Sequence, residues 1–302
     1  MELRDASSSE QVSRKWRCRL ASEFVRKLID SGIHFGHRTS AWDPKMRPYV
    51  FGTRNQIHII DIRETVKGLL CARKFVANVV AKGQDVLFVG TKRQARHAVM
   101  EAAKRAGMHY VSERWLGGTL TNYRTIRSRL ARLEELEAIE AEGMAGKYSK
   151  KMIATLTRER RKIKRNLEGI RGMTKLPGAL FVIDVRREYI SCLEARKLKI
   201  PVIGVIDTDS DPDYVDIPIP GNDDAMRAIE MICESLVEAI EEGKRARPPE
   251  AVNEAAPARG SAAGRRSSRA AARGEAAAEQ PAEEGGGAAG DQPVSDSAVA
   301  ST

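Results

Sequence analysis

The chain contains few cysteines and no long apolar run, and both absences exclude classes of protein. Its four cysteines, Cys18, Cys71, Cys192 and Cys233, lie far apart with no C-x-x-C pair. This spacing favours neither a zinc knuckle nor a disulfide framework, so we expect buried, reduced thiols. No apolar run is long enough to predict a transmembrane helix, and the N-terminus lacks the apolar core of a secretory signal. We therefore expect a soluble protein that stays inside the cell.

Sequence motifs of common enzyme and cofactor sites are also absent. The chain has neither G-x-G-x-x-G nor the phosphate-binding G-x-x-x-x-G-K-[ST], and it has no G-x-S-x-G or suggestive Cys-His pair. His34 and His37 could form half of a metal site, but no third ligand lies nearby in the sequence. We expect no enzyme activity, no cofactor, no metal and no small-molecule substrate.

The acidic run DTDSDPD at 207–213 begins like a calcium loop but departs from that motif. Pro212 replaces the required glycine, and Pro218 occupies the position of the bidentate glutamate. The run is better explained as a turn after a strand. Loosely bound Mg²⁺ on Asp207, Asp209 and Asp211 remains an alternative.

Positive charge is in excess, and the excess lies in one part of the chain. Lys and Arg total 51 against 41 Asp and Glu, a formal net charge of +10. From Lys244 to the end there are 8 basic and 8 acidic residues, so the whole excess lies on residues 1–243. This excess indicates an anionic partner such as nucleic acid or a membrane surface.

Short apolar runs alternate with segments of helical length, which predicts an α/β fold. Continuous runs are typical of strands that are covered on both faces. They are QIHIID (56–61), DVLFVG (85–90), ALFVID (179–184) and PVIGVID (201–207). Amphipathic segments at 63–82, 92–106 and 188–199 separate them. We therefore expect a layered, mostly parallel sheet.

Residues 124–171 interrupt this alternation and predict a coiled-coil hairpin of two antiparallel helices. Apolar residues recur there at helical spacing, with a turn predicted at GMAGKYS (143–149). The second half, 147–171, has 10 basic and 2 acidic residues, while 124–142 has 4 and 5. The basic run RERRKIKR (158–165) is either a nucleic-acid contact or a solvated helix face.

Two further basic segments are candidate nucleic-acid contacts. The segment 31–55 intersperses aromatic residues with arginine and lysine, which suits phosphate contact and base stacking. The turn GTKR (90–93) precedes a predicted helix that begins with cations, and an external phosphate would relieve their repulsion by the helix dipole. The single glycine of this turn is only weak evidence for nucleotide binding. The turn could bind the phosphate of a polymer, bind a nucleotide, or simply face solvent.

A series of motifs resembles one known family, that of the bacterial small-subunit ribosomal protein S2. The motifs run in order from about Ser22 to Glu242. They are Gly32-x-His34-Phe35-Gly36-His37, Trp42-x-Pro44-Lys45-Met46, Arg54-Asn55, His58-Ile59-Ile60, Gly90-Thr91-Lys92, Arg114-Trp115-Leu116-Gly117-Gly118-Thr119-Leu120-Thr121-Asn122, Leu176-Pro177-x-Ala179-Leu180, Ile200-Pro201 and Ile219-Pro220-Gly221-Asn222-Asp223-Asp224-Ala225. The chain departs from the pattern at Asp43 and Asp209, where Asn is usual, and at Cys192, where an aliphatic residue is usual.

The resemblance implies a flavodoxin-like, three-layer α/β fold with an inserted coiled-coil hairpin and a disordered C-terminal tail. The expected parts are an N-terminal extension (1–22), an α/β domain (23–123 and 172–243), the hairpin (124–171) and the tail (244–302). It also implies a structural, non-enzymatic role in the cytoplasm. The protein would be bound to the ribosome through small-subunit ribosomal RNA and neighbouring proteins, including ribosomal protein S1.

The expected RNA-binding residues combine the resemblance with the basic segments described above. They are His34, His37, Arg38, Trp42, Lys45, Arg47, Arg54, Lys92, Arg93, Arg96, Arg114, Trp115, Asn122, Arg160, Arg161 and Lys164. Two alternatives remain open at this point. One is a Rossmann-like enzyme that binds a nucleotide at the strand ends, and the other is an adaptor that binds a protein through the hairpin.

Overall fold

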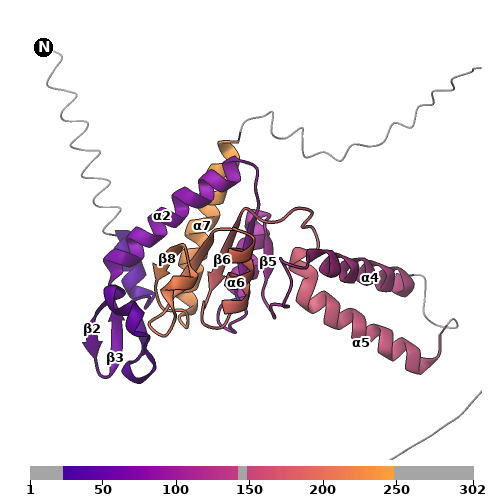
Figure 1. Cartoon of the computed structure of the whole chain (residues 1–302), viewed down its shortest axis with the longest axis horizontal. Helices are drawn as coiled ribbons and strands as arrows, with labels where there is room; N and C mark the ends of the chain where they lie inside the picture. The colour runs from indigo at the N-terminus through magenta and orange to yellow at the C-terminus, as the bar shows by residue number, and fades with distance from the viewer. Residues whose placement is uncertain (1–22, 142–147, 248–302) are drawn as a thin grey trace, which may run out of the picture. The chain divides into compact units, whose positions relative to one another are not determined.

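The computed structural model describes residues 23–141 and 148–247, which contain two β-sheets and their helices (Figure 1). The predicted N-terminal extension, the tip of the hairpin at 142–147 and the tail beyond residue 247 lie outside the described residues. No helix in the described part of the chain combines the length and the apolar character that a membrane span requires.

The larger sheet has five parallel strands and confirms the predicted α/β class. Its strands are β4 (Val86–Val89), β5 (His109–Val111), β6 (Ala179–Ile183), β7 (Val202–Ile206) and β8 (Ile217–Pro220). They lie in the order β5-β4-β6-β7-β8. Counted along the chain, this is the order 2-1-3-4-5 of the flavodoxin-like fold, whose strand order reverses between β4 and β6.

Both faces of this sheet are covered, which explains the continuous apolar runs. Every residue of β4, β6 and β7 is buried. Phe88 and Phe181 point to one face, where they pack with α2 (Ile62–Ala81), α3 (Arg96–Ala106) and α7 (Met226–Arg245). Leu87 and Leu180 point to the other face and pack with α6 (Tyr189–Lys197). The sheet therefore lies between two layers of helices.

The smaller sheet is antiparallel, and the prediction that 56–61 belongs to the parallel sheet is wrong. The strands β1 (Phe35–Arg38) and β2 (Val50–Arg54) pair with β3 (Ile57–Ile60) on either side. Asn55 and Gln56 both have positive φ, so they form the tight turn that returns β2 into β3. The short helices η1 (Thr39–Ala41) and η2 (Pro44–Tyr49) link β1 to β2.

Two long helices follow β5, as the spacing of their apolar residues predicts. They are α4 (Tyr123–Ala141) and α5 (Lys150–Leu167), and η3 (Glu168–Ile170) follows them. Leu133 and Leu136 of α4 and Leu156 of α5 are buried, and Arg132 of α4 lies 3.6 Å from Glu159 of α5. The helices thus pack side by side, while their description as a coiled coil stays a prediction.

Other differences from the predicted pattern are local. Helix α7 continues to Arg245, beyond the predicted start of the tail. Cys192 and Cys233 are buried as expected, but Cys71 is exposed. The edge strand β8 (IPIP) and the short helix η4 (Pro212–Tyr214) were not predicted.

Gly68 shows how closely α2 approaches the sheet. A Cβ atom at this position would overlap the carbonyl oxygen of Pro218 in β8. In an open helix, Gly→Ala stabilises by about 0.5–1 kcal/mol. Here we expect Gly68→Ala to lower the free energy of unfolding by about 1–3 kcal/mol, because backbone must move to admit the methyl group.

Denaturant unfolding followed by circular dichroism would measure this change. The matched control is Asn78→Ala, at an exposed position of the same helix, which should leave stability unchanged or slightly raised. A Gly68→Ala variant as stable as this control would contradict the close contact between α2 and β8.

Candidate nucleic-acid interface

The segment 34–54, which contains β1 and β2, carries the first group of predicted site residues, and its side chains divide into exposed and buried ones. Arg38, Arg47 and Arg54 are exposed and have no ion-pair partner among the residues that the structure describes. Trp42 is partly buried, with its ring centroid 4.9 Å from that of His58. His34 is also partly buried, and burial lowers its pKa.

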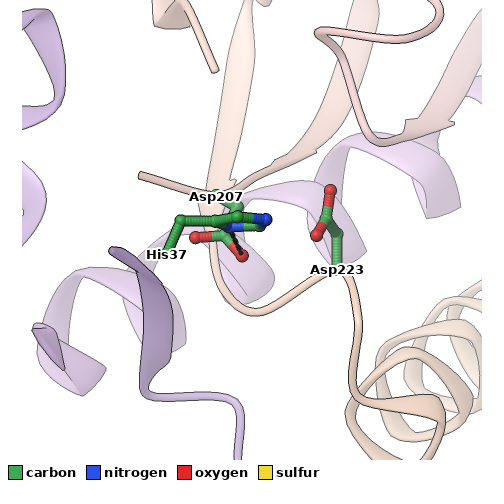
Figure 2. A group of neighbouring side chains, drawn as sticks. All are labelled: His37, Asp207 and Asp223. Carbon is green, nitrogen blue, oxygen red and sulfur yellow. Dashed lines mark ion pairs between the residues drawn. The ribbon is translucent and has the colours of Figure 1, made fainter. Parts of the chain in front are cut away.

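His37 lies against three acids that follow the parallel strands, of which Figure 2 shows Asp207. Its Nδ1 is 3.1 Å from Asp207 and 4.0 Å from Asp209, and its Nε2 is 3.6 Å from Asp224. The contact with Asp207 raises the pKa of His37 to about 9, although burial opposes this change. His37 is therefore protonated at neutral pH and balances charge within the protein.

His37, Asp207 and Asp223 also form the one group of possible metal ligands found in the described parts of the chain. One ligand atom of each lies within 4.8 Å of the others, and Asp207 and Asp223 are buried (Figure 2). An imidazole nitrogen and two carboxylate oxygens could together bind a divalent cation. The sequence-based expectation that the protein binds no metal stays a prediction.

Lys45 pairs with the acidic turn that was considered for Mg²⁺. Its ammonium lies 2.7 Å from Asp211 and 2.6 Å from Asp213, and these contacts raise the pKa of Lys45. Arg186 lies 2.9 Å from Asp209 in the same turn. Asp207, Asp209 and Asp211 therefore face three different cations, which gives no support to a single Mg²⁺ shared among them.

The turn after β4 places Lys92 inside the protein. Its ammonium lies 2.6 Å from both Asp223 and Asp224, and only 13% of its side chain is exposed. The predicted helix start at residue 92 is wrong, because α3 begins at Arg96. Arg96 in turn lies 3.1 Å from Glu113. Of the three cations predicted to bind phosphate here, only Arg93 is exposed with no partner among the described residues.

The carboxyl ends of β4 and β6 are unsuited to a nucleotide. This is the position where flavodoxin-like folds bind such ligands. Here the Thr91 hydroxyl donates a hydrogen bond to the buried Glu188, and burial raises the pKa of Glu188. A Cβ atom on Gly90 would lie 2.8 Å from Val99, so this glycine is required for packing. The geometry gives no support to the nucleotide-enzyme alternative.

The loop 114–122 is organised by one acid, Glu194 of α6, which the sequence analysis missed. One oxygen of the buried carboxylate accepts hydrogen bonds from the Trp115 indole N–H at 3.1 Å and the Gly118 backbone N–H at 2.7 Å. The other accepts from the backbone N–H groups of Leu120 and Thr121 at 3.0 and 3.1 Å.

These contacts determine which residues of the loop can reach a partner. Trp115 is only 8% exposed and belongs to the core, whereas Arg114 and Asn122 are exposed. Burial by itself would raise the pKa of Glu194, but the hydrogen bonds from the loop outweigh it, so the pKa lies below its usual value. The carboxylate is therefore ionised and fixes the loop.

The predicted cations of α5 also differ from one another. Arg160 pairs with Glu140 of α4 and is partly buried, and the Lys164 ammonium lies 3.8 Å from Glu137. Arg161 is exposed and has no ion-pair partner in the described residues. Arg160 thus joins the two helices, while Arg161 faces solvent.

The sequence analysis gave no role to three acids that organise the site: Asp223, Asp224 and Glu194. A signal for the first two existed in the sequence, because both closely follow the apolar residues of β8. Carboxyl ends of parallel strands meet at one edge of the sheet, so these acids had to lie near the residues after β4. Nothing in the local sequence of α6 marked Glu194.

We expect Glu194→Gln to lower the free energy of unfolding by about 2–3 kcal/mol at pH 7, because the amide cannot replace a charged acceptor for four N–H groups. A lowered pKa stabilises the fold above the unfolded value of about 4.3, and this contribution is lost as pH falls through the folded value. The difference between wild type and variant should therefore shrink below about pH 4.

Denaturant unfolding between pH 3 and pH 7 would measure this difference. Glu230→Gln is the matched control, because Glu230 is exposed and makes no hydrogen bond or ion pair within the described residues. If the two variants have the same stability at pH 7, Glu194 does not organise the loop.

Comparisons with known proteins agree with the motifs in the sequence. The family model described as ribosomal protein S2 matches residues 28–243. The small ribosomal subunit protein uS2 of Rhodopirellula baltica is 57% identical over 225 residues, which are 74% of this chain and 86% of the relative. Those of Syntrophobacter fumaroxidans and Geotalea uraniireducens are 50% and 48% identical, over 73% and 74% of this chain and 81% and 87% of the relatives. The chain therefore belongs to the ribosomal protein S2 family, whose members are structural proteins of the small ribosomal subunit and not enzymes.

Proposed function

We propose that the chain binds small-subunit ribosomal RNA through the exposed cations of its loops and of α5. Six of the predicted arginines are exposed and lack an ion-pair partner in the described part of the chain. They are Arg38, Arg47, Arg54, Arg93, Arg114 and Arg161. Basic side chains on phosphates supply affinity and position a protein without reading the base sequence.

The observation that carries this proposal is the unequal charge of the two long helices. Helix α5 contains eight cations and one acid, yet only Arg160 and Lys164 lie within ion-pair distance of α4 in the described residues. Arg158, Arg161 and Arg165 are exposed at spacings of three and four residues, so they share a face of the helix. A polyanion would neutralise the positive charge of this face.

The residues that the structure buries or pairs have a different role in this proposal. His37, Lys45, Lys92 and Trp115 position the loops, while the exposed arginines beside them contact phosphate. His34, Trp42, Arg96, Asn122, Arg160 and Lys164 remain proposed contacts at the edges of these surfaces.

The proposed partners and location follow from the family. We propose that the chain is bound to the ribosome in the cytoplasm and contacts neighbouring small-subunit proteins, including ribosomal protein S1. We also propose the division into an N-terminal extension (1–22), an α/β domain (23–123 and 172–243), a coiled-coil hairpin (124–171) and a tail (244–302).

Replacing Arg158, Arg161 and Arg165 together with glutamine should weaken binding to a small-subunit ribosomal RNA transcript and reduce its salt dependence. Each lost phosphate contact lowers the slope of log affinity against log salt by about 0.7–0.9, so three contacts predict a change of about 2–3. Filter binding across a range of potassium chloride concentrations would measure the slope.

A variant in which Lys74, Lys82 and Arg227 are replaced with glutamine is the matched control, because these exposed cations lie outside the proposed surfaces. It removes the same charge and should leave the slope close to that of the wild type. Equal slopes for the two variants would contradict a contact through α5. Loss of a protein contact with unchanged RNA affinity would instead favour the adaptor alternative.

A further inference from the structure

We infer that a hollow at the base of α4 and α5 (Figure 1) holds one unpaired base of ribosomal RNA, and that Asn166 hydrogen-bonds to that base. This inference rests on the proposed RNA-binding function and deepens it, because it assigns one nucleotide to one place on the protein. Asn166 belongs neither to the predicted contact residues nor to the exposed arginines described above.

The hollow lies where the loop 114–122 meets the two long helices, and it has a volume of about 310 Å³. Leu116 of the loop and Arg129 of α4 line it, together with side chains of α5. Those of α5 are Glu159, Lys162, Ile163, Asn166 and Leu167. Its volume is at the lower end of the range for pockets that bind small organic groups. Because the Glu194 carboxylate fixes the loop, the wall formed by Leu116 is in place before a ligand binds.

Apolar side chains form the walls of the hollow. Leu167 is buried, and Leu116 and Ile163 are partly buried. Ile163 and Asn166 are three residues apart in α5, so they share a face of the helix. A flat ring packs well between such walls, as extruded bases do in protein pockets. A base can enter only after it has left its duplex, so the ligand is an unpaired nucleotide.

Asn166 gives the hollow a polar atom that needs a partner. Its Oδ1 is buried and accepts no hydrogen bond from any residue that the structure describes. A buried acceptor without a donor costs free energy, so such a group in a native protein calls for a ligand or another polar group. Phosphate oxygens only accept hydrogen bonds, whereas the amino group of a base donates them. Adenine fits best, because Oδ1 of an asparagine accepts from its N6 amino group while Nδ2 donates to its N7.

The rim of the hollow carries positive charge. Arg129 and Lys162 are exposed, and neither has an ion-pair partner within the described residues. The acid of the lining, Glu159, already lies 3.6 Å from Arg132 of α4. The phosphates on either side of an inserted base would meet the two unpaired cations. A single nucleotide therefore supplies the flat ring, the hydrogen-bond donor and the negative charge that this hollow lacks.

The first test uses the full-length chain and a small-subunit ribosomal RNA transcript. Asn166→Leu should weaken binding about fivefold to a hundredfold, the range for one well-formed contact between an amide and a base. The salt slope should stay unchanged, because the substitution removes no charge. In denaturant unfolding, the variant should be as stable as the wild type or more stable, because an apolar group replaces an unpaired buried acceptor.

Asn78→Leu is the matched control, because Asn78 is exposed on α2, away from the hollow. It should bind RNA within about twofold of the wild type, as surface substitutions outside a contact do. Lys162→Gln should weaken binding and also lower the salt slope, by about 0.7–0.9 for one lost phosphate contact. A weaker affinity for Asn166→Leu together with a lower stability would indicate a structural role and would overturn the inference.

A second pair of variants tests the space itself. Ile163→Phe should fill part of the hollow and weaken RNA binding without unfolding the protein, because the ring has room to enter. Ile163→Val keeps the hollow open and should bind as the wild type does.

Dimethyl sulfate probing of the transcript would identify the base. The wild-type protein should protect one unpaired adenine from modification. Asn166→Leu and Ile163→Phe should restore its reactivity and leave the other protections of the complex in place.

The outcomes separate this inference from the proposed function. If the wild type binds the transcript with a steep salt dependence while Asn166→Leu and Ile163→Phe bind equally well, the amide meets only solvent and this inference alone fails. If these variants keep their RNA affinity but no longer enter small subunits, the hollow receives a protein side chain and the inference is overturned. If the wild type itself does not bind the transcript, the proposed function fails as well.

Discussion

Buried carboxylates at the carboxyl edge of the parallel sheet are the constraint on which the rest of this structure depends. Asp207 and Asp223 are almost completely buried. A buried carboxylate is costly in free energy unless a cation pairs with it. His37 of β1 and Lys92 of the turn after β4 meet this requirement, and both belong to the N-terminal half of the chain. Charge pairing at one edge of the sheet therefore fixes the loops that surround it.

This arrangement divides the positive charge of the protein into two populations. His37 and Lys92 neutralise buried acids, Lys45 pairs with acids of the turn after β7, and together these contacts shape the loops. Arginines such as Arg38 and Arg161 remain exposed and place positive charge on the surface. Glu194 acts in the same way as the buried aspartates, because it fixes a loop whose outer residues are left free. Internal ion pairs thus create a fixed external charge pattern.

The sequence predicted the parts of the fold that depend on local pattern. Buried strands such as ALFVID are continuous apolar runs, and the leucine spacing of α4 was sufficient to predict a helix. The run 56–61, which contains β3 (Ile57–Ile60), was misassigned because a short apolar run does not reveal which sheet it joins. The burial and ion pairing of Lys92 could not be predicted either, because its partner Asp223 lies 131 residues away in the chain. Likewise, an aromatic residue in a basic segment looks the same whether it is buried, as Trp115 is, or exposed.

The sequence separation of these ion pairs has a consequence for biosynthesis. Lys45 contacts Asp211 across 166 residues, and Lys92 contacts Asp223 across 131. A ribosome making this chain releases the basic half long before the acids that neutralise it. During that interval the growing polypeptide presents more uncompensated cations to surrounding nucleic acid than the finished protein does. Synthesis of the C-terminal third therefore supplies the acids that complete these ion pairs.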